Sequence, residues 1–391
     1  MRCPLITDLP PCPAGKSGWP WTEGETQNID AMCISSGPPI SIVMPSFNQE
    51  PFIEEAIRSV LLQGYGDLEF IVIDGGSTDG TVDIIRKYEP WLSFWVSERD
   101  SGQADALSKG FGRSTGKILA WLNSDDIYCK EALRLVGRYY SEYPETGLLY
   151  GDTEVIGADH GVIHRIRGQD ANLELLLTRN IIPQPSAFFS RQAFENAGGI
   201  NSDLHFIMDY ELWIRMMLQG VRLHYVPQLL SRFRWYQISK SGSYSTQFGY
   251  EYLSFLEKLF RDPHSERLIK NKLNAFHYAF MMIMACNGQG ADDSDILKAL
   301  ALWTQHLEKY QTDYCKVPKL WADSLYRIGD AYCLQGFMRK GRDYFSKSFG
   351  VNKRLDNMAL ACWLLSCMGN KVYRSYTGIR RILLPLIRRW Q

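Results

Sequence analysis

The stretch Leu119-Ala-Trp-Leu-Asn-Ser-Asp-Asp126 contains an apolar run that stops at two adjacent carboxylates. Such runs are typical of strands buried in parallel sheets, and ligands of open α/β sheets bind beyond the carboxyl ends of these strands. Two neighbouring carboxylates repel each other unless a cation lies beside them, and a divalent metal carrying a phosphorylated substrate would provide one. A helix N-cap is the alternative, because Asp is favoured there. The stretch therefore predicts a strand that ends at a metal site or at a cap.

Similar apolar runs precede this stretch and alternate with amphipathic helical patterns. The predicted strands span residues 40–44, 68–73, 92–96 and 118–122, and the predicted helices span 52–61, 81–88 and 104–111. This alternation indicates βαβ units and a parallel sheet, that is, an α/β fold. From about residue 147 to 234 the alternation loosens, with strands near 148–150 and 187–189 and a helix near 210–218.

Composition narrows the class of protein. The chain has 391 residues, of which 45% are hydrophobic, so it can bury a large core. Lys+Arg and Asp+Glu both total 43, so no overall field favours nucleic acid as a partner. The nine cysteines form no CxxC pair, which fits free thiols in a reducing cytoplasm. We recognise no secretory leader pattern and no apolar run long enough to span a bilayer.

Three regions are expected along the chain. Residues 1–39 are rich in Pro and Gly and predict an irregular arm, with Trp19 and Trp21 docked on the protein. Residues 40–242 form the α/β domain, and residues 243–391 are helical, with one tetratricopeptide-like helix pair in which Gly341 replaces the usual Ala. The segment 373–390 interleaves arginines with apolar residues, which predicts either peripheral membrane contact or a basic capping helix.

Three further turns carry polar residues near the ends of predicted strands. Pro45-Ser-Phe-Asn48 offers an aromatic ring and an amide for a base, although Ser46 or Asn48 as a helix cap is the alternative. Asp74-Gly-Gly-Ser-Thr-Asp-Gly80 combines a strand-end carboxylate with glycines that allow close approach of a ligand, whereas its Asp79 is expected to cap the next helix. Asp100-Ser-Gly102 supplies another candidate carboxylate.

In this order and spacing, PSFN, DGGSTDG, DSG and LNSDD resemble the nucleotide-sugar half of family 2 glycosyltransferases. Downstream, Gln184-Pro-Ser-Ala-Phe-Phe189, Gly198-Gly199 and Met208-Asp-Tyr-Glu-Leu-Trp213 resemble the acceptor half of the same family. The resemblance covers about residues 40 to 242. It implies a GT-A fold with a mixed, mainly parallel sheet, a nucleoside-diphosphate sugar donor with UDP as the default, Mn²⁺ or Mg²⁺, and transfer with inversion to a glycan or glycolipid.

The resemblance also implies roles for individual residues. Phe47 would lie against the base and Asp74 would bind uracil or ribose. Asp125 and Asp126 would occupy the metal-and-diphosphate motif, with Asp126 the direct ligand, and Asp209 would be the general base. The residues expected at the nucleotide sugar are Pro45, Ser46, Phe47, Asn48, Asp74, Gly75, Asp100, Ser101, Gly102, Asn123 and Asp125, and those expected at the acceptor are Gln184, Glu211 and Trp213.

The chain departs from the family pattern at three positions. The metal motif often begins with Asp and here begins with Asn123, a His is often found where this chain has Tyr236, and Met208 stands where Glu is frequent. Tyr236 would therefore cost one contact to diphosphate or metal. Two other functions stay open: a sugar-phosphate nucleotidyltransferase, although PSFN is not the Gly-rich basic loop that such an enzyme would need, and a non-catalytic scaffold with a degenerate transferase domain.

Overall fold

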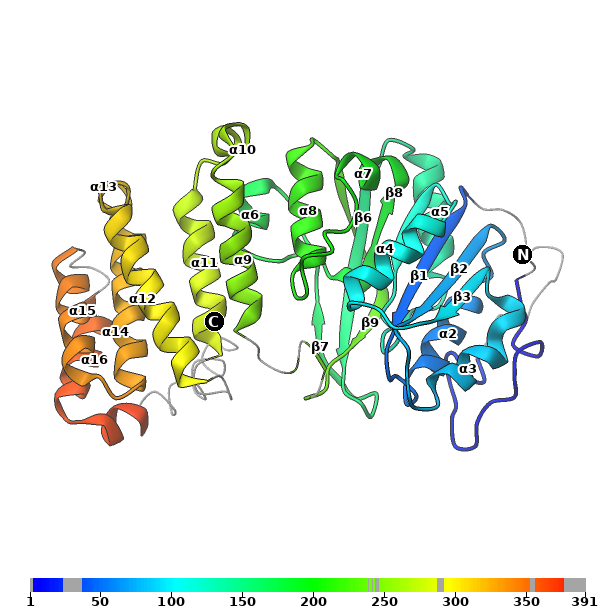
Figure 1. The fold of residues 1–391 in the computed structure, drawn as a ribbon, viewed down its shortest axis with the longest axis horizontal. Coiled ribbons are helices and arrows are strands. Elements are labelled where there is room, and N and C mark those ends of the chain that lie inside the picture. Colours follow the sequence, from blue (N-terminus) through cyan, green and yellow to red (C-terminus); the bar gives the residue numbers. More distant parts are fainter. Residues whose placement is uncertain are drawn as a thin grey trace. The chain divides into compact units, whose positions relative to one another are not determined.

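The computed structural model describes residues 3–23, 37–237, 239–240, 242, 246–286, 292–351 and 356–375. The chain divides into two compact units (Figure 1). One comprises Met1–Ser243 and Arg267–Ile269, and the other comprises Tyr244–Glu266 and Lys270–Gln391. Most of the predicted basic segment 373–390 lies outside the described residues. The predicted domain limits at residues 39 and 242 stay a prediction.

The first unit is built on one mixed sheet in the order β3-β2-β1-β4-β8-β6-β9-β5, with β7 paired to β6. Strands β3, β2, β1 and β4 are mutually parallel, whereas β8 joins β4 and β6 by antiparallel pairing and β9 runs parallel to β6. The strands are β1 (Ile40–Ser46), β2 (Leu68–Asp74), β3 (Phe94–Ser97), β4 (Ile118–Trp121), β5 (Ile127–Tyr128), β6 (Leu148–Ile156), β7 (Val162–Ile166), β8 (Ala187–Ser190) and β9 (Leu223–Arg234).

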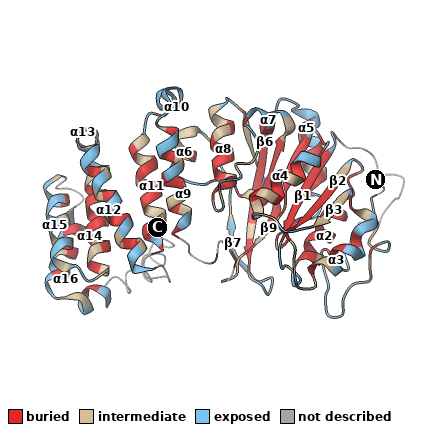
Figure 2. Cartoon of the chain, viewed as in Figure 1, coloured by how far each residue is buried: buried red, intermediate tan, exposed pale blue. Residues whose placement is uncertain are grey.

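Helices cover both faces of this sheet, and its central strands are buried (Figure 2). Side chains alternate along β1, so Ile42 and Met44 pack on one face while Val43 meets the other. On that other face the close approach of Gly110 to Val43 leaves no room for a Cβ. Helices α2 (Ile53–Leu61), α3 (Thr81–Tyr88) and α5 (Ala132–Glu142) contribute to the first face, and α4 (Gln103–Arg113), α7 (Arg191–Asn196) and α8 (Met208–Leu218) to the second.

The strand register brings the candidate turns together. Ser46, Asp74 and Ser97 are paired in register at the last positions of β1, β2 and β3. Because the strands are parallel, the loops that follow them leave from one edge of the sheet. The short elements η1 (Glu89–Trp91), α6 (Leu173–Leu176) and η2 (Gln184–Ser186) complete the unit, and η2 leads directly into β8.

The described part of the N-terminal arm docks on this unit through a buried arginine. Arg58 of α2 is 1% exposed, and its guanidinium donates to the carbonyls of Pro10, Pro20 and Trp21 at 2.9, 3.1 and 3.3 Å. The indole of Trp19 donates to the carbonyl of Tyr128 at 2.8 Å. The arm is therefore fixed by its backbone, which explains how an irregular segment keeps a defined position.

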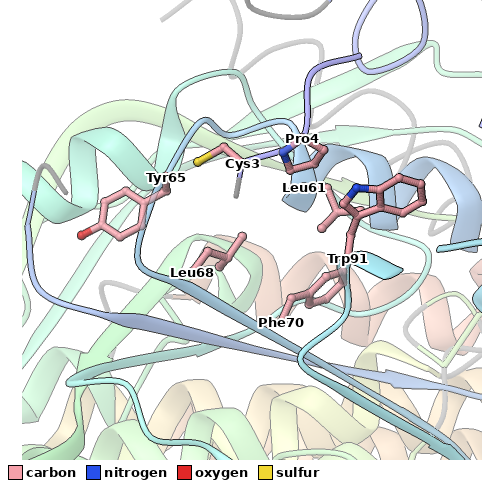
Figure 3. A pocket seen from close by; sticks show the side chains of 7 residues that line it. All are labelled: Cys3, Pro4, Leu61, Tyr65, Leu68, Phe70 and Trp91. Atoms are coloured by element: carbon pink, nitrogen blue, oxygen red, sulfur yellow. The ribbon is translucent and has the colours of Figure 1, made fainter. Parts of the chain in front are cut away.

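A small apolar pocket lies under the start of the arm (Figure 3). Its lining includes Cys3, Leu68 and Trp91. Leu68 is the first residue of β2, whereas Asp74 is the last. The pocket thus lies at the amino end of β2, at the opposite end of this strand from the candidate turn.

The second unit is helical. Its α14 and α15 form a hairpin in which Gly329 and Gly341 pack closely, because a Cβ at Gly329 would meet Phe345 and one at Gly341 would meet Cys333. Whether this hairpin is a tetratricopeptide repeat stays a prediction. The helices after the sheet are α9 (Gln247–Leu259), α10 (Pro263–Leu268), α11 (Lys272–Ala285), α12 (Asp293–Lys309), α13 (Gln311–Tyr314), α14 (Pro318–Leu334), α15 (Met338–Val351) and α16 (Asp356–Cys367).

The predicted fold class is confirmed: a mixed α/β sheet domain is followed by a helical region. The sequence missed β5, β7 and β9. Strand β9 contains Pro227, which lacks a donor for the sheet, and its polar residues hide the apolar pattern. The eight cysteines in the described residues are free thiols. In the described parts of the chain, every helix is too short or too polar to traverse a bilayer.

Candidate active site

The loop after β2 is organised by Asp74, which is 0% exposed. One carboxylate oxygen accepts from the hydroxyl of Ser77 at 2.5 Å. The other accepts from the backbone N–H groups of Gly76 and Ser77 at 3.1 and 2.9 Å and from the hydroxyl of Ser97 at 2.6 Å. Both oxygens therefore hold their own loop and the end of β3. Asp79 accepts from the backbone N–H of Thr81, the first residue of α3, as expected of a cap.

The loop after β1 presents an aromatic ring. Phe47 is 58% exposed, which is unusual for so large an apolar side chain. Asn48 adopts a left-handed conformation with φ of 52°, and its amide oxygen accepts from the backbone N–H of Thr78 at 2.9 Å. The Ser46 hydroxyl is buried without a partner in the described structure. Asn48 thus ties two loops together, whereas Phe47 and Ser46 have capacity for a ligand.

The loop after β3 lies against the loop after β2 and beside the ring of His205. A Cβ on Gly75 would come within 2.8 Å of a carboxylate oxygen of Asp100, so this glycine allows the two loops to touch. The other oxygen of Asp100 accepts from the backbone N–H of Gly102 at 2.9 Å. Gly102 has φ of 114°, and a Cβ there would lie 3.7 Å from the ring of His205. Ser101 is exposed.

Asp126 is turned into the protein. It is 0% exposed, and its two oxygens accept from the backbone N–H of Arg234 at 2.9 Å and from the amide of Asn123 at 3.2 Å. Burial and the neighbouring charge of Asp125 raise the pKa of Asp126 well above its ordinary value. We predicted Asp126 as the direct metal ligand. In this structure both of its oxygens accept hydrogen bonds within the protein, and its role at a metal stays a prediction.

Asp125 faces the other way and is half-buried. Its carboxylate accepts from the phenol of Tyr236 at 3.0 Å, and that phenol in turn accepts from the amide of Gln49 at 3.4 Å. The ring of Tyr236 packs at 5.2 Å from that of Phe52. Burial raises the pKa of Asp125, and the hydrogen bond from Tyr236 opposes this shift. Tyr236 therefore contacts the motif directly, and the expected loss of a contact to diphosphate or metal stays a prediction.

A buried arginine holds the 123–126 loop from behind. Arg234 is 1% exposed and donates to the carbonyl of Asp125 at 3.0 Å. It also donates to the carbonyls of Gly157 and Ala158 at 3.3 and 3.4 Å. Its remaining nitrogen forms a buried ion pair with Glu55 at 3.0 Å. The backbone of the loop is thus fixed by Arg234 and not by the carboxylate of Asp125.

A chain of polar side chains connects this loop with the start of α8. The Asn123 oxygen accepts from Gln103 at 2.7 Å, and the Gln103 oxygen accepts from Lys240 at 2.7 Å. Lys240 also donates to the carbonyl of His205 at 2.8 Å. His205 precedes Asp209 by four residues. The chain therefore links the strand-end carboxylates to the segment that carries the predicted base.

Asp209 lies in the first turn of α8 and is half-buried. Burial raises its pKa, whereas the backbone N–H groups of Tyr210 and Asp209 and the charge of Lys240 lower it. The charge of Lys240 also acts on Asp125. Both carboxylates therefore lie within the electrostatic reach of one ammonium group. A raised carboxyl pKa is the property expected of a general base.

Two of the three predicted acceptor residues are buried in this structure. Trp213 is 0% exposed and stacks on Trp121 with ring centroids 5.6 Å apart, so it belongs to the core. Glu211 is 3% exposed and pairs with Arg215 at 2.7 Å. Arg215 also donates to the carbonyl of Gly199 at 2.8 Å, so the pair holds the Gly198-Gly199 turn against α8. Neither side chain is accessible to an acceptor.

Gln184 uses both ends of its amide inside the protein. Its nitrogen donates to the carbonyl of Trp121 at 2.8 Å, and its oxygen accepts from Asn123 at 3.2 Å. It therefore supports the 123–126 loop. In the described residues, no group of three or more His, Cys, Asp or Glu side chains forms a ready-made metal site.

Comparison with known proteins agrees with these motifs. Residues 41–198 match the sequence profile of Glycosyl transferase family 2. A PGL/p-HBAD biosynthesis glycosyltransferase of Mycobacterium bovis is 30% identical over 184 residues, which are 46% of this chain and 70% of the relative. An uncharacterised glycosyltransferase of Mycobacterium tuberculosis is 29% identical over 191 residues, which are 47% of this chain and 71% of the relative.

Two solved structures are similar at lower identity. A mannosyltransferase from Pyrobaculum calidifontis, in complex with GDP-Man and Mn²⁺, has a TM-score of 0.46 and 20% identity, over 76% of this chain and 84% of the other. TarS 1–349 of S. aureus, in complex with UDP-GlcNAc, has a TM-score of 0.49 and 14% identity, over 87% and 92%. Because both TM-scores are below 0.5, nothing about ligands follows from these two structures.

The loops at the carboxyl ends of β1, β2, β3 and β4 and the start of α8 define an enzyme of the glycosyltransferase class with a GT-A fold. The chain belongs to glycosyltransferase family 2.

Proposed function

We propose that this chain transfers a sugar with inversion from a nucleoside-diphosphate sugar, UDP-sugar by default, to a glycan or glycolipid acceptor in the biosynthesis of a surface polysaccharide or glycoconjugate. One observation carries the proposal. Asp125 and Asp209, from different halves of the domain, are both within the field of Lys240, which the hydrogen-bond chain through Gln103 ties to Asn123. A donor and an acceptor could therefore meet between them.

The donor would lie over the loops after β1, β2 and β3. Phe47 would stack on the base, since an exposed aromatic ring offers its face to any nucleobase. The unpaired Ser46 hydroxyl and the exposed Ser101 would bind base, ribose or diphosphate. Asp74 and Asn48 would act through the loops they hold, because their oxygens already accept hydrogen bonds there.

The residues present fit a hard divalent cation, Mn²⁺ or Mg²⁺. Such ions prefer oxygen ligands, and Mg²⁺ is commonly bound by one or two carboxylates together with substrate phosphates and water. Asp125 supplies a half-buried carboxylate whose pKa is raised by burial, and a nearby cation would offset that effect. Asp125 would therefore hold the cation, with Asn123 beside it. When bound, the cation would stabilise the charge that develops on the departing diphosphate.

Asp209 would take the proton of the acceptor hydroxyl. A sugar hydroxyl is a weak nucleophile at neutral pH, and a positioned carboxylate contributes about 10²–10⁴-fold by accepting its proton as the new bond forms. Burial raises the pKa of Asp209, and the backbone N–H groups of Tyr210 and Asp209 and the charge of Lys240 oppose this shift. A base on one side of the anomeric carbon and a leaving diphosphate on the other suffice for inversion in a single step.

Family membership favours glycosyl transfer over nucleotidyl transfer. The non-catalytic alternative rested on Asn123, Met208 and Tyr236. Two of these three are integrated in the site, since Asn123 hydrogen-bonds to Gln103 and Tyr236 to Asp125. That integration argues against decay of the site.

The test begins with a panel of nucleotide sugars screened by thermal shift with Mn²⁺, because a ligand that binds the folded state raises its apparent stability by RT ln(1+[L]/Kd). The donor found in this way is then used to measure donor hydrolysis and transfer. We expect Asp209→Asn to lower the rate about 10²–10⁴-fold at unchanged donor affinity. Asp203→Asn, an exposed Asp in the preceding loop, is the matched control. Full activity in Asp209→Asn would refute the proposed base.

A further inference from the structure

Helix α16 has an apolar surface on both sides. Ala359, Cys362 and Ser366 are 2%, 0% and 1% exposed and pack inward. The opposite side carries Leu360, Leu364 and Cys367, and Met368 directly follows the helix. All four are exposed, and we call them the α16 patch. Leu360, Leu364 and Met368 are 46%, 53% and 66% exposed. Their spacing of four residues places them in one row on a helix.

Another long helix of the same unit shows what an ordinary outer face looks like. On α12 the exposed side chains include Lys298, Gln305 and Glu308, with Leu302 at 39% as an isolated apolar residue. Scattered exposed leucines of this kind are normal in soluble proteins. A contiguous apolar row is different and marks an interaction surface.

The charge of the surrounding sequence indicates the partner. Residues 357–391 contain no Asp or Glu, although acidic and basic residues are equal in number over the whole chain. Cationic residues are distributed through this segment at Lys371, Arg374, Arg380, Arg381, Arg388 and Arg389. Between them stand Ile379, Ile382, Leu383, Leu386, Ile387 and Trp390. Arginine and lysine interleaved with apolar residues is the composition of segments that lie at the surface of anionic membranes.

We propose that the α16 patch, together with Lys371 and Arg374 shortly after it, docks on the surface of an anionic phospholipid bilayer. The aliphatic side chains would enter the boundary between headgroups and acyl chains, and the cations would meet lipid phosphates. A nucleic acid would be attracted by the cations but would leave the aliphatic row in water. A second copy of the chain would present the same positive charge and would be repelled.

The test uses the full chain and vesicles without glycolipid, so it does not depend on the proposed acceptor. Co-sedimentation is measured with phosphatidylcholine vesicles and with phosphatidylcholine–phosphatidylglycerol vesicles, at low and high salt. We expect binding to the anionic vesicles alone, weakened by salt because surface charges are screened. Replacing both Leu364 and Met368 by Glu should weaken this binding at least about tenfold. Leu302→Glu, an equally drastic change at an exposed leucine of α12, should have no effect.

Each alternative occupant gives a different result. If the wild-type chain ignores anionic vesicles, or if the Leu364→Glu, Met368→Glu double variant binds as well as Leu302→Glu, the proposal is wrong. If the double variant loses thermal stability relative to Leu302→Glu, another part of the chain covers the patch and the proposal is also wrong. A wild-type dimer in solution that the double variant converts to monomer would assign the patch to a second copy instead. Unchanged stability and a monomeric wild type would support docking on the bilayer.

Discussion

The loops that follow β2 and β4 begin alike and are held in opposite ways. Each follows a buried parallel strand and carries a strand-end carboxylate, and β1 alone lies between the two strands. In the 74–80 loop, Asp74 itself accepts the hydrogen bonds that fix the loop. In the 123–126 loop, Arg234 fixes the backbone from behind, and the carboxylate of Asp125 accepts from Tyr236 at the surface of the site.

A strand-end carboxylate is therefore available to a ligand when another group fixes the loop that carries it. Asp74 is 0% exposed and fixes its own loop by accepting hydrogen bonds from it. Asp125 is half-buried, and Arg234 fixes the backbone of its loop instead. The two loops should therefore respond oppositely to the same substitution. Stability should depend on Asp74 and Arg234, and ligand binding should depend on Asp125.

The largest expected effect is on the support of the 123–126 loop. Arg234→Ala removes the buried partner of Glu55, whose side chain is 5% exposed, and leaves Glu55, among the described residues, with only the ring of His160 at 3.5 Å. We expect a loss of about 3–5 kcal/mol in the free energy of unfolding, measured by urea denaturation. The control is Arg232→Ala, two residues earlier in β9, where the pair with Glu154 has a similar distance of 3.1 Å but greater exposure. Arg232→Ala should lower the free energy of unfolding by about 0–1 kcal/mol. Equal costs for the two variants would show that Arg234 does not hold this loop.

The comparison between Asp74 and Asp125 gives the next effect. Asp74→Asn replaces an acceptor by a donor that faces hydroxyl and N–H groups. We therefore expect it to lower the free energy of unfolding by about 2–3 kcal/mol. Asp125→Asn should leave stability within about 1 kcal/mol of wild type or raise it. The raised pKa of Asp125 means that ionisation costs stability as the pH rises through that pKa, and Asn removes this cost. Thermal unfolding at neutral pH measures both variants. The reverse order of stabilities would contradict the assigned roles.

The pH dependence of transfer should reflect the raised pKa of Asp209. A base must be ionised to work, so kcat/KM should fall about tenfold per pH unit below that pKa. The acid limb should therefore begin above the ordinary range of an Asp carboxyl. It is measured at saturating Mn²⁺, so that protonation of Asp125 does not contribute. The residual activity of Asp209→Asn should lack this acid limb. If the acid limb persists in Asp209→Asn, another group is responsible for it.

The smallest effect concerns Tyr236. Its phenol donates to the ionised form of Asp125, so Tyr236→Phe should raise the pKa of Asp125 further. The pH at which half of the Mn²⁺ affinity is lost should rise by the same amount, while the unfolding temperature stays constant. Tyr139→Phe, which removes a hydroxyl that contacts His224, serves as control. An unchanged midpoint in Tyr236→Phe would show that the hydrogen bond does not tune Asp125.

The sequence predicts the parallel half of the sheet well because the signal is local. Apolar runs of four to seven residues end at polar turns, and the helix at Thr81–Tyr88 has the predicted bounds. The second half is harder, since the antiparallel pairing of β8 with β4 and β6 joins segments far apart in the chain. Polar residues and Pro227 in β9 also mask a strand whose last residue, Arg234, supports the site.

Within the site, the sequence predicts which residues gather but not which way they point. Asp125 and Asp126 are adjacent, and only the fold decides that one faces Tyr236 while the other faces the backbone of Arg234. Trp213 and Glu211 look like acceptor contacts because they follow Asp209 closely. On the helix, however, Glu211 lies two residues on and faces another side, whereas Trp213 lies four residues on and packs against Trp121. Both side chains are buried.

The central claim is that Asp125 is left free to bind the cation and diphosphate of the donor while Asp209 acts on the acceptor. Its most direct test is Mn²⁺ binding by electron paramagnetic resonance, measured on the full chain with UDP. We predict that Asp125→Asn weakens Mn²⁺ binding at least about tenfold, whereas Asp209→Asn binds Mn²⁺ as the wild type does and fails in transfer. Wild-type Mn²⁺ affinity in Asp125→Asn would contradict the account.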